Sequence, residues 1–185
     1  MLPLAFNFDG VAVLVVGAGK VGTYKATQLM DAGARVTIIT EAFIAPIPEG
    51  VERVEKRRYK PGDLRGFSLV VSATGNGEAN DALVLEADQE RIWLNVVDDP
   101  ERSSFYFMAL HRQGSVTVAV TTEGAAPALA QEIRSLVAQR LPGNLADVAN
   151  TLREERRALH ERGETTEGID WRPRIRELLG TDPMA

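Results

Sequence analysis

The sequence predicts an α/β fold, a doubly wound parallel sheet followed by a small helical region. Three observations support this prediction. Runs rich in Val and Ile recur between residues 11 and 120, and each is typical of a buried strand. Glycine-rich turns and segments with helical spacing separate these runs. After Leu141-Pro142-Gly143 the chain becomes charged, with a broken helical stripe of apolar residues.

The first strand is predicted at residues 11–16 and leads directly into Gly17, Gly19 and Gly22. This is the spacing G-x-G-x-x-G, in which each glycine has its own steric role. The first permits a tight turn, the second lets a pyrophosphate approach the backbone, and the third allows the helix to pack closely on the strand. The spacing indicates a dinucleotide-binding turn.

A helix is predicted at residues 20–32, ending at a capping glycine, Gly33. Its N-terminus presents amide groups and a positive dipole to phosphates. A second strand follows at residues 35–39, and Glu41 lies nineteen residues after Gly22, where an acid can accept hydrogen bonds from a ribose diol. The acid favours NAD over NADP. Strand, glycines, helix and acid in this order predict a Rossmann-type nucleotide-binding fold.

The remaining elements follow the same alternation, with a Pro- and Gly-containing loop after Glu41. Residues 1–10 are expected to form a lead-in strand or turn. Strands are predicted at residues 51–55, 69–73, 92–97 and 116–120, and helices at residues 78–89 and 127–140.

Two turns follow strands of the predicted sheet. Residues 74–77 are small and polar, so a cofactor could pass over their backbone at the switch point. The alternative is a plain turn with Asn76 as a helix cap, and the position at the strand end favours the cofactor. Asp98 and Asp99 follow the strand at 92–97, and before Pro100 they could simply form a turn. By pattern alone, turn formation is the stronger interpretation of both aspartates.

Other charged and aromatic segments have ordinary interpretations. The basic run at residues 56–60 is expected to be a solvated surface feature. The apolar run at residues 105–110 is expected to line a pocket or interface or simply to pack. His111 is expected to be a surface or hydrogen-bonded histidine.

Composition excludes several classes of protein. The chain has 185 residues, 44% of them hydrophobic, enough for a core. A formal charge of −5 with scattered basic residues argues against nucleic-acid binding. The absence of cysteine excludes disulfides, thiolate catalysis and cysteine-ligated metals, and two histidines cannot form a cluster. The sequence shows no apolar segment long enough to span a membrane and no signal segment, so a soluble cytoplasmic protein is expected.

The region after residue 144 contains amphipathic helices joined by a loop at residues 163–170. Such a small region buries little apolar surface by itself, so it needs the first domain or a second subunit as a cover. The domain boundary is expected near residues 112–116.

At this point the chain resembles the precorrin-2 dehydrogenases of siroheme biosynthesis, including the N-terminal module of siroheme synthases. The segments that carry the resemblance are MLPLAFNFDG with VLVVGAGKVGTYKA, DAGARVTIIT, LVVSAT, LNVVDDPERSSF, and VTVAVTTEGAAPALAQEIR with LPGNL. They come in the family's order and span most of the chain.

The resemblance implies oxidation of precorrin-2 to sirohydrochlorin with NAD as hydride acceptor, and in some members insertion of ferrous iron. It assigns Asp98 as the catalytic acid or base. It also implies a homodimer with three parts, namely an NAD-binding Rossmann domain at residues 1–112, a dimerisation segment at 113–144 and a helical C-terminal domain at 145–185.

The chain departs from the family pattern at Ala18, Tyr24, Met108, Glu123 and Ala126. The last two change the expected tetrapyrrole side and add negative charge there. Cations must then hold the carboxylates of the substrate. The predicted substrate-binding residues are Lys25, Arg102, Thr122 and Arg134; the predicted cofactor-binding residues are Gly17, Gly19, Lys20, Val21, Gly22, Glu41, Thr74, Asn76, Asn95 and Val97; no metal ligand is predicted.

Two other functions are considered. A non-catalytic NAD-binding module that senses redox state would bind nucleotide with nothing to react. A short-chain dehydrogenase would need Tyr-x-x-x-Lys, whereas Tyr24-Lys25 and Tyr59-Lys60 are adjacent pairs. Iron insertion cannot be judged from residues; it would depend mainly on the macrocycle and a carboxylate such as Asp98.

Overall fold

The computed structural model describes residues 2–180 and divides into two compact units, one ending at Tyr106 and one beginning at Phe107. Among the described residues, no helix is long and apolar enough to cross a membrane.

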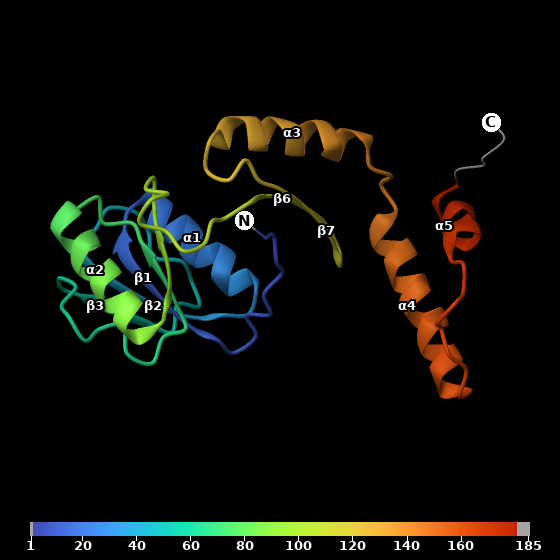
Figure 1. Cartoon of the computed structure of the whole chain (residues 1–185), viewed down its shortest axis with the longest axis horizontal. Coiled ribbons are helices and arrows are strands. Elements are labelled where there is room, and N and C mark those ends of the chain that lie inside the picture. The colour runs from blue at the N-terminus through green and yellow to red at the C-terminus, as the bar shows by residue number, and fades with distance from the viewer. Residues whose placement is uncertain (1, 181–185) are drawn as a thin grey trace. The chain divides into compact units, whose positions relative to one another are not determined.

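The first unit is built on a five-stranded parallel sheet (Figure 1). The strand order is β3-β2-β1-β4-β5, so the chain reverses its direction of travel across the sheet between β1 and β4. This reversal is the switch point of a doubly wound sheet, and it confirms the predicted fold class. The strands are β1 (Ala12–Ala18), β2 (Arg35–Phe43), β3 (Arg53–Lys56), β4 (Leu69–Ser72) and β5 (Trp93–Val96).

Two helices cross over between parallel strands of this sheet. Helix α1 (Lys20–Asp31) joins β1 to β2, and α2 (Gly77–Glu90) joins β4 to β5 in the opposite direction. Because such crossovers are right-handed, the two helices cover opposite faces. Leu83 and Ala87 of α2 pack with Leu14, Val70 and other strand residues in one core cluster.

The core strands are buried because their side chains are covered on both faces. Val13, Leu14 and Val15 of β1 are completely buried, and so are Val70 and Val71 of β4. Continuous β-branched and aliphatic runs of this kind suit a sheet covered by helices on both sides. The outer strand β3 has mostly exposed residues, as expected at an edge.

Helix α1 ends in a Schellman motif, in which the N–H groups of the two residues after the cap bond to carbonyls of the last turn. The Gly33 N–H donates to the Met30 carbonyl at 2.8 Å, and the Ala34 N–H donates to the Leu29 carbonyl at 3.0 Å. Gly33 has a φ of +93°, which a side chain would oppose. The predicted glycine termination is confirmed.

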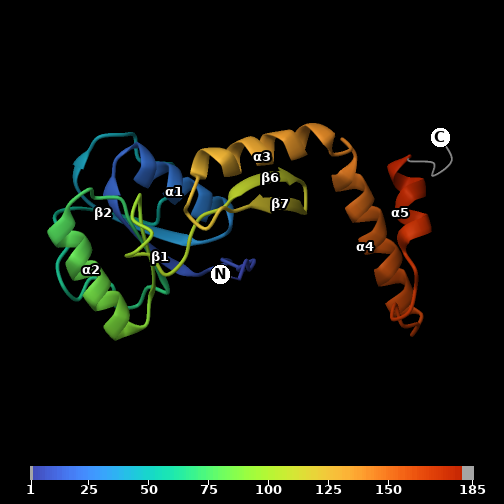
Figure 2. The same ribbon diagram turned by 45° about the horizontal axis from the view of Figure 1, so that its top comes forward.

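The second unit begins with an antiparallel hairpin of β6 (Ala109–Gln113) and β7 (Val116–Val120). Helix α3 (Pro127–Arg140) packs along this hairpin (Figure 2). Alternation leaves Thr117 and Ala119 exposed.

The first strand of the hairpin was not expected from the sequence, because β6 begins within the apolar run at residues 105–110. The lining or packing role of that run stays a prediction. His111 in β6 is half-buried, and its Nε2 is buried without a hydrogen-bond partner within residues 2–180, so the expected surface or hydrogen-bonded histidine is only partly found. The aromatic content of the run concealed the strand, which forms by pairing with β7.

Helices α4 (Leu145–Glu161) and α5 (Arg172–Leu179) complete the second unit and lie side by side (Figure 1). Arg174 donates to Glu155 at 2.6 and 2.9 Å, and Asn144 donates to the Leu178 carbonyl at 2.9 Å. Val148 is the buried residue of α4. Polar contacts therefore hold this helical pair more than apolar burial does.

Most predicted elements are present within one or two residues of their expected bounds. Residues 2–8 have no regular secondary structure and residues 9 and 10 form a turn, so the lead-in is the expected turn and no strand. The three-part division at residues 112 and 144 stays a prediction, and its residues 1 and 181–185 lie outside the described part of the chain.

Candidate functional site

The candidate site is the edge of the sheet where the parallel strands of the first unit end. β1 ends in the glycine turn, and β4 leads into Thr74. β5 leads into Asp98, and Glu41 lies near the end of β2. Ligands of open parallel sheets bind outside the carboxyl ends of the strands at the switch point, so this edge collects most of the predicted residues.

The three fingerprint glycines have different surroundings. A Cβ atom on Gly17 would lie 2.5 Å from the Ala73 carbonyl oxygen, and one on Gly22 would lie 2.0 Å from the Gly17 carbonyl oxygen. A Cβ atom on Gly19 would meet nothing within 4 Å. Gly17 and Gly22 are therefore needed for packing, whereas the space beside Gly19 is open to a ligand. These surroundings fit a bound pyrophosphate.

The first turn of α1 is suited to an anion. Gly19 caps the helix without a side-chain hydrogen bond, and the turn contains no acidic residue. Lys20 and Val21 are exposed in this turn. Helix N-termini present unpaired amides and a positive dipole, so these residues could hold the phosphates of NAD.

Thr40 holds the glycine turn in place, a role not identified from the sequence. Its Oγ1 accepts a hydrogen bond from the Ala18 N–H at 3.1 Å and donates to the Ala42 carbonyl at 2.8 Å. Thr40 is 5% exposed. A buried hydroxyl between β1 and β2 thus fixes the turn on the side that leads to Glu41.

Glu41 is exposed and forms an ion pair with Arg58, whose Nε lies 2.8 Å from Oε2. The basic run at residues 56–60 is therefore only partly a solvated feature. Arg57 in the same run pairs with Asp63 and Glu55, and the Asp63 hydrogen bond is the main cause that raises the pKa of Arg57. Arg58 was not identified from the sequence because its partner lies seventeen positions away.

The turn after β4 combines both of its possible roles. Asn76 caps α2 by accepting a hydrogen bond from the Ala79 N–H at 3.0 Å. The Thr74 hydroxyl accepts from the Asn76 N–H and lies 3.3 Å from Asn80 Oδ1. Asn76 is exposed beyond the sheet edge. The capping interpretation of Asn76 is confirmed, and contact with a cofactor stays a prediction for both residues.

Asp98 lies in a four-residue turn closed by a hydrogen bond from the Asp99 N–H to the Val96 carbonyl at 3.1 Å. Its φ is +62°, in the left-handed region that favours glycine and, among other residues, Asn and Asp. The carboxylate is exposed and has no hydrogen-bond or ion-pair partner within residues 2–180. A strained, unpaired acid directly after a core strand is typical of a functional position.

Ser103 secures this turn, a role not identified from the sequence. Its hydroxyl donates to the Asp99 carbonyl at 2.7 Å and accepts from the Val96 N–H at 2.9 Å. Val97, half-buried, donates its N–H to the Ser72 carbonyl at 2.9 Å. The backbone on both sides of Asp98 is thus fixed while its side chain stays available.

Asn95 and Arg102 have structural partners in the first unit. Asn95 is buried, and its amide donates to the Phe105 carbonyl at 3.0 Å. Arg102 pairs with Asp99 at 2.6 Å and with Asp81 at 2.7 Å. The Arg102 hydrogen bond lowers the pKa of Asp99, whereas the Asp99 and Asp81 carboxylates raise the pKa of Arg102. Ligand contacts for both residues stay predictions.

Lys25 lies in the second turn of α1 and is half-buried beside Tyr24. Its Nζ is 5.7 Å from the Tyr24 ring centroid and 3.3 Å from Gln28 Oε1. Burial lowers the pKa of Lys25 to about 8. A lysine with this pKa carries a partial charge near neutral to alkaline pH, so its ability to hold a carboxylate would decline as the pH rises.

The other two predicted substrate residues lie in the second unit. Thr122 Oγ1 accepts from the Ala126 N–H at 3.1 Å in the loop before α3. Arg134 on α3 donates to Gln131 at 2.9 Å, and its Nε is buried without a partner in the described chain. In the same loop Glu123 has a φ of +54°. The loop is fixed by its own hydrogen bonds.

Within residues 2–180, no three His, Asp or Glu side chains gather where they could hold a metal ion. The arrangement at the sheet edge instead combines open backbone amides, an exposed acid at β2 and an exposed acid after β5. Such a set can bind a dinucleotide and accept a proton from a second ligand.

Comparisons with known proteins agree with this geometry. The family described as putative NAD(P)-binding matches residues 4–109. The siroheme synthase of Tolumonas auensis is 34% identical over 181 residues, 97% of this chain and 35% of its own length. Siroheme synthase 2 of Aeromonas hydrophila is 36% identical over 159 residues, 83% of this chain and 34% of its own length.

A solved structure titled SirC, precorrin-2 dehydrogenase, has a TM-score of 0.74 and 24% identity, covering 97% of this chain and 88% of that chain. It supports the fold described above. The chain spans about a third of the length of the siroheme synthases it matches. These relatives confirm the resemblance drawn from the sequence, and the match over residues 4–109 shows that the chain belongs to the putative NAD(P)-binding family.

Proposed function

We propose that the chain is an NAD-dependent precorrin-2 dehydrogenase, which oxidises precorrin-2 to sirohydrochlorin in siroheme biosynthesis. The observation that carries the proposal is the extent of the similarity to siroheme synthases. It covers 97% of the chain at 34% identity and therefore continues past the nucleotide-binding match at residues 4–109 into the second unit. A nucleotide-binding domain alone would not require this continuation.

In the proposed reaction the chain's residues bind, orient and accept a proton. The backbone amides of residues 17–22 hold the phosphates, and Glu41 accepts hydrogen bonds from the ribose hydroxyls. Bound NAD supplies the acceptor for the hydride that leaves the macrocycle. Asp98 takes the proton lost with that hydride and passes it to water, so the macrocycle loses two hydrogens and gains a double bond.

The position of Asp98 supports its role as base. The turn is fixed by Ser103 and by the Asp99-to-Val96 hydrogen bond, while the carboxylate has no partner of its own within residues 2–180. Such a base is positioned by its backbone and needs no rearrangement to accept a proton. Arg102, Lys25, Thr122 and Arg134 are proposed to bind the substrate carboxylates.

We also propose that the chain acts as a homodimer. Leu129, Ile133 and Leu136 of α3 are 52%, 37% and 53% exposed and follow helical spacing on one face. A contiguous exposed apolar stripe on a helix is typical of an interface. Light scattering with Leu136→Glu tests this, because a charge in the interface should shift the molecular mass toward that of the monomer.

The proposed reaction is tested with purified chain, precorrin-2 made enzymatically and NAD, following sirohydrochlorin by its visible absorption and NADH by fluorescence. We expect Asp98→Asn to lower kcat by about 100-fold or more. Asn also tolerates the left-handed backbone, so NAD affinity and the melting temperature should not change. Asp88→Asn is the matched control, because Asp88 is an exposed acid on α2.

Sirohydrochlorin formation at the wild-type rate in Asp98→Asn would contradict the role of the base. NAD binding by the wild type with no product would contradict the enzyme and favour the redox-sensing module. Ferrous iron added to the completed reaction shows, by formation of siroheme, whether the chain also inserts iron.

A further inference from the structure

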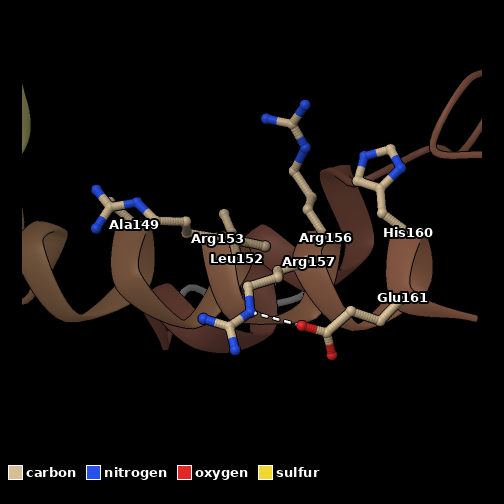
Figure 3. A pocket seen from close by; sticks show the side chains of 7 residues that line it. All are labelled: Ala149, Leu152, Arg153, Arg156, Arg157, His160 and Glu161. Carbon is tan, nitrogen blue, oxygen red and sulfur yellow. Dashed lines mark hydrogen bonds and ion pairs between the residues drawn. The ribbon is translucent and has the colours of Figure 1, made fainter.

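The second unit contains a hollow along α4 that none of the predicted site residues lines (Figure 3). Its volume is about 640 Å³, and it is an open hollow on the surface of one helix. Every residue that lines it belongs to α4, and the seven positions repeat at intervals of three and four residues between 149 and 161. They therefore form one stripe along the helix.

Four of the lining residues are arginine or histidine: Arg153, Arg156, Arg157 and His160. All four are exposed. The only acid in the lining is Glu161, which pairs with Arg157 at 2.8 Å. With His160 neutral, three arginines and one glutamate give a net charge of +2, whereas the whole chain has −5. The hollow thus has the opposite sign to the molecule that carries it.

Two of the arginines also have partners on α4. Arg157 pairs with Glu161, and Arg153 donates to Asn150 Oδ1 at 3.2 Å. Arg153 nevertheless lies three and four positions before Arg156 and Arg157, and like charges at these spacings destabilise a helix. The ion pair that holds α4 to α5 comes from another face, through Glu155 and Arg174. Arg156 makes no ion pair within residues 2–180, so a structural role does not account for it.

Part of the lining of the hollow is apolar. Ala149 and Leu152 lie in the same stripe as the arginines and are half-buried. A ligand that suits both parts has an apolar body and several peripheral carboxylates, because arginine forms strong bidentate hydrogen bonds to carboxylates. A tetrapyrrole with carboxylate side chains has this chemistry.

We propose that the α4 stripe is a docking site for the carboxylates of a polycarboxylate macrocycle, and this inference rests on the proposed function for the identity of the ligand. Arg153 and Arg156 bind carboxylates directly. Arg157 is partly neutralised by Glu161, and Leu152 contacts the apolar body.

The test uses uroporphyrin, a fluorescent macrocycle that carries a carboxylate on each side chain, and measures its binding to the full chain without NAD. We expect the double variant Arg153→Gln, Arg156→Gln to bind about tenfold more weakly, since each exposed ion pair contributes a few-fold. Gln keeps a good helix propensity, so the fold should be retained. The salt dependence of binding should also become shallower.

The matched control is Arg162→Gln, Arg172→Gln, which removes the same charge from exposed arginines of the same unit that pair with Glu164 and Asp170. Coproporphyrin, with half as many carboxylates, should bind more weakly than uroporphyrin to the wild type. Equal losses in the two double variants, or no binding to the wild type, would overturn the proposal. Displacement by a polyglutamate peptide at lower concentration than by coproporphyrin would assign the stripe to an acidic protein segment and overturn the ligand class.

The binding measurement separates this site from the proposed reaction. Asp98→Asn should bind uroporphyrin as the wild type does, while it loses turnover. If the chain fails to oxidise precorrin-2 but binds uroporphyrin through Arg153 and Arg156, the reaction fails and the docking site stands. If turnover is normal and the double variant binds uroporphyrin unchanged, the docking site fails alone.

Discussion

The two units of the molecule are stabilised in different ways. Of the 22 buried hydrophobic residues in the described part of the chain, 19 lie in the first unit and only Ala109, Ala130 and Val148 lie in the second. The second unit depends on a hairpin, a covering helix and ion pairs such as Arg174 with Glu155. The core of the first unit can hold the sheet-edge loops in place without a partner. The second unit leaves apolar side chains of α3 exposed, and a partner could cover them.

The largest difference between the units is expected in core mutations. Leu14→Ala removes a completely buried side chain of β1 and should lower the free energy of unfolding by about 2–5 kcal/mol. Leu136→Ala removes a side chain that is 53% exposed on α3 and should change it by about 0.5 kcal/mol or less in the monomer. Urea unfolding at low protein concentration measures both. Equal losses would mean that the units share one core.

Within the first unit, substitution of two glycines should distinguish a role in packing from a role in NAD binding. Gly22→Ala places a Cβ 2.0 Å from the Gly17 carbonyl oxygen, so α1 must move, and we expect a loss of about 1–3 kcal/mol. Gly19→Ala meets nothing within 4 Å and should leave stability nearly unchanged while weakening NAD binding. Thermal unfolding and NADH titration of both variants check this. Normal NAD affinity in Gly19→Ala would place the pyrophosphate elsewhere.

Substitutions in the exposed ion pair of Glu41 and Arg58 should affect NAD binding more than stability. Glu41→Gln removes the proposed acceptor of the ribose hydroxyls and should weaken NAD binding by about tenfold. Arg58→Gln removes only an exposed ion-pair partner and should change NAD affinity by about threefold or less. Calorimetric titration with NAD compares the two. A larger effect of Arg58→Gln would make the cation, and not the acid, the contact with the ribose.

The smallest effect is a pH dependence at Lys25. Burial holds the pKa of this lysine at about 8, below its ordinary value of 10.5, so below pH 8 the charged form opposes folding. As the pH rises from about 8 to 10.5, the folded chain releases this proton before the unfolded chain does, and the penalty disappears. Lys25→Met should therefore raise the melting temperature by about 2–4 °C at pH 7 and by less at pH 10. A constant difference would mean that burial does not affect the charge.

Local patterns predicted the first unit well. Val13 to Val16, the three glycines and Gly33 act through steric rules that need only their neighbours, and helix α1 and strand β2 follow from them. The exact match of β7 and α3 has the same origin, since Val116–Val120 is β-branched and Pro127 suits a first helical turn. The chemistry of Asp98 was implied by the resemblance and not by its spacing.

Contacts between distant positions could not be predicted. Strand β6 forms only because β7 pairs with it, so its polar His111 and Gln113 gave no strand signal. The partners of the basic run, Glu41 for Arg58 and Glu86 for Tyr59, become neighbours through the sheet and α2. The basic stripe of α4 is different, because its spacing is visible in the sequence beside the apolar stripe of the same helix.

The left-handed backbone at Asp98 also bears on how the chain can change over time. Asn and Gly are the residues best suited to that conformation, and each is reached from an aspartate codon by changing a single base. Either substitution would remove the carboxylate without opposing the turn that Ser103 secures. Under the proposed role of Asp98 as the base, a gene for this fold lies one point mutation from a folded, inactive descendant, which selection on stability would not remove.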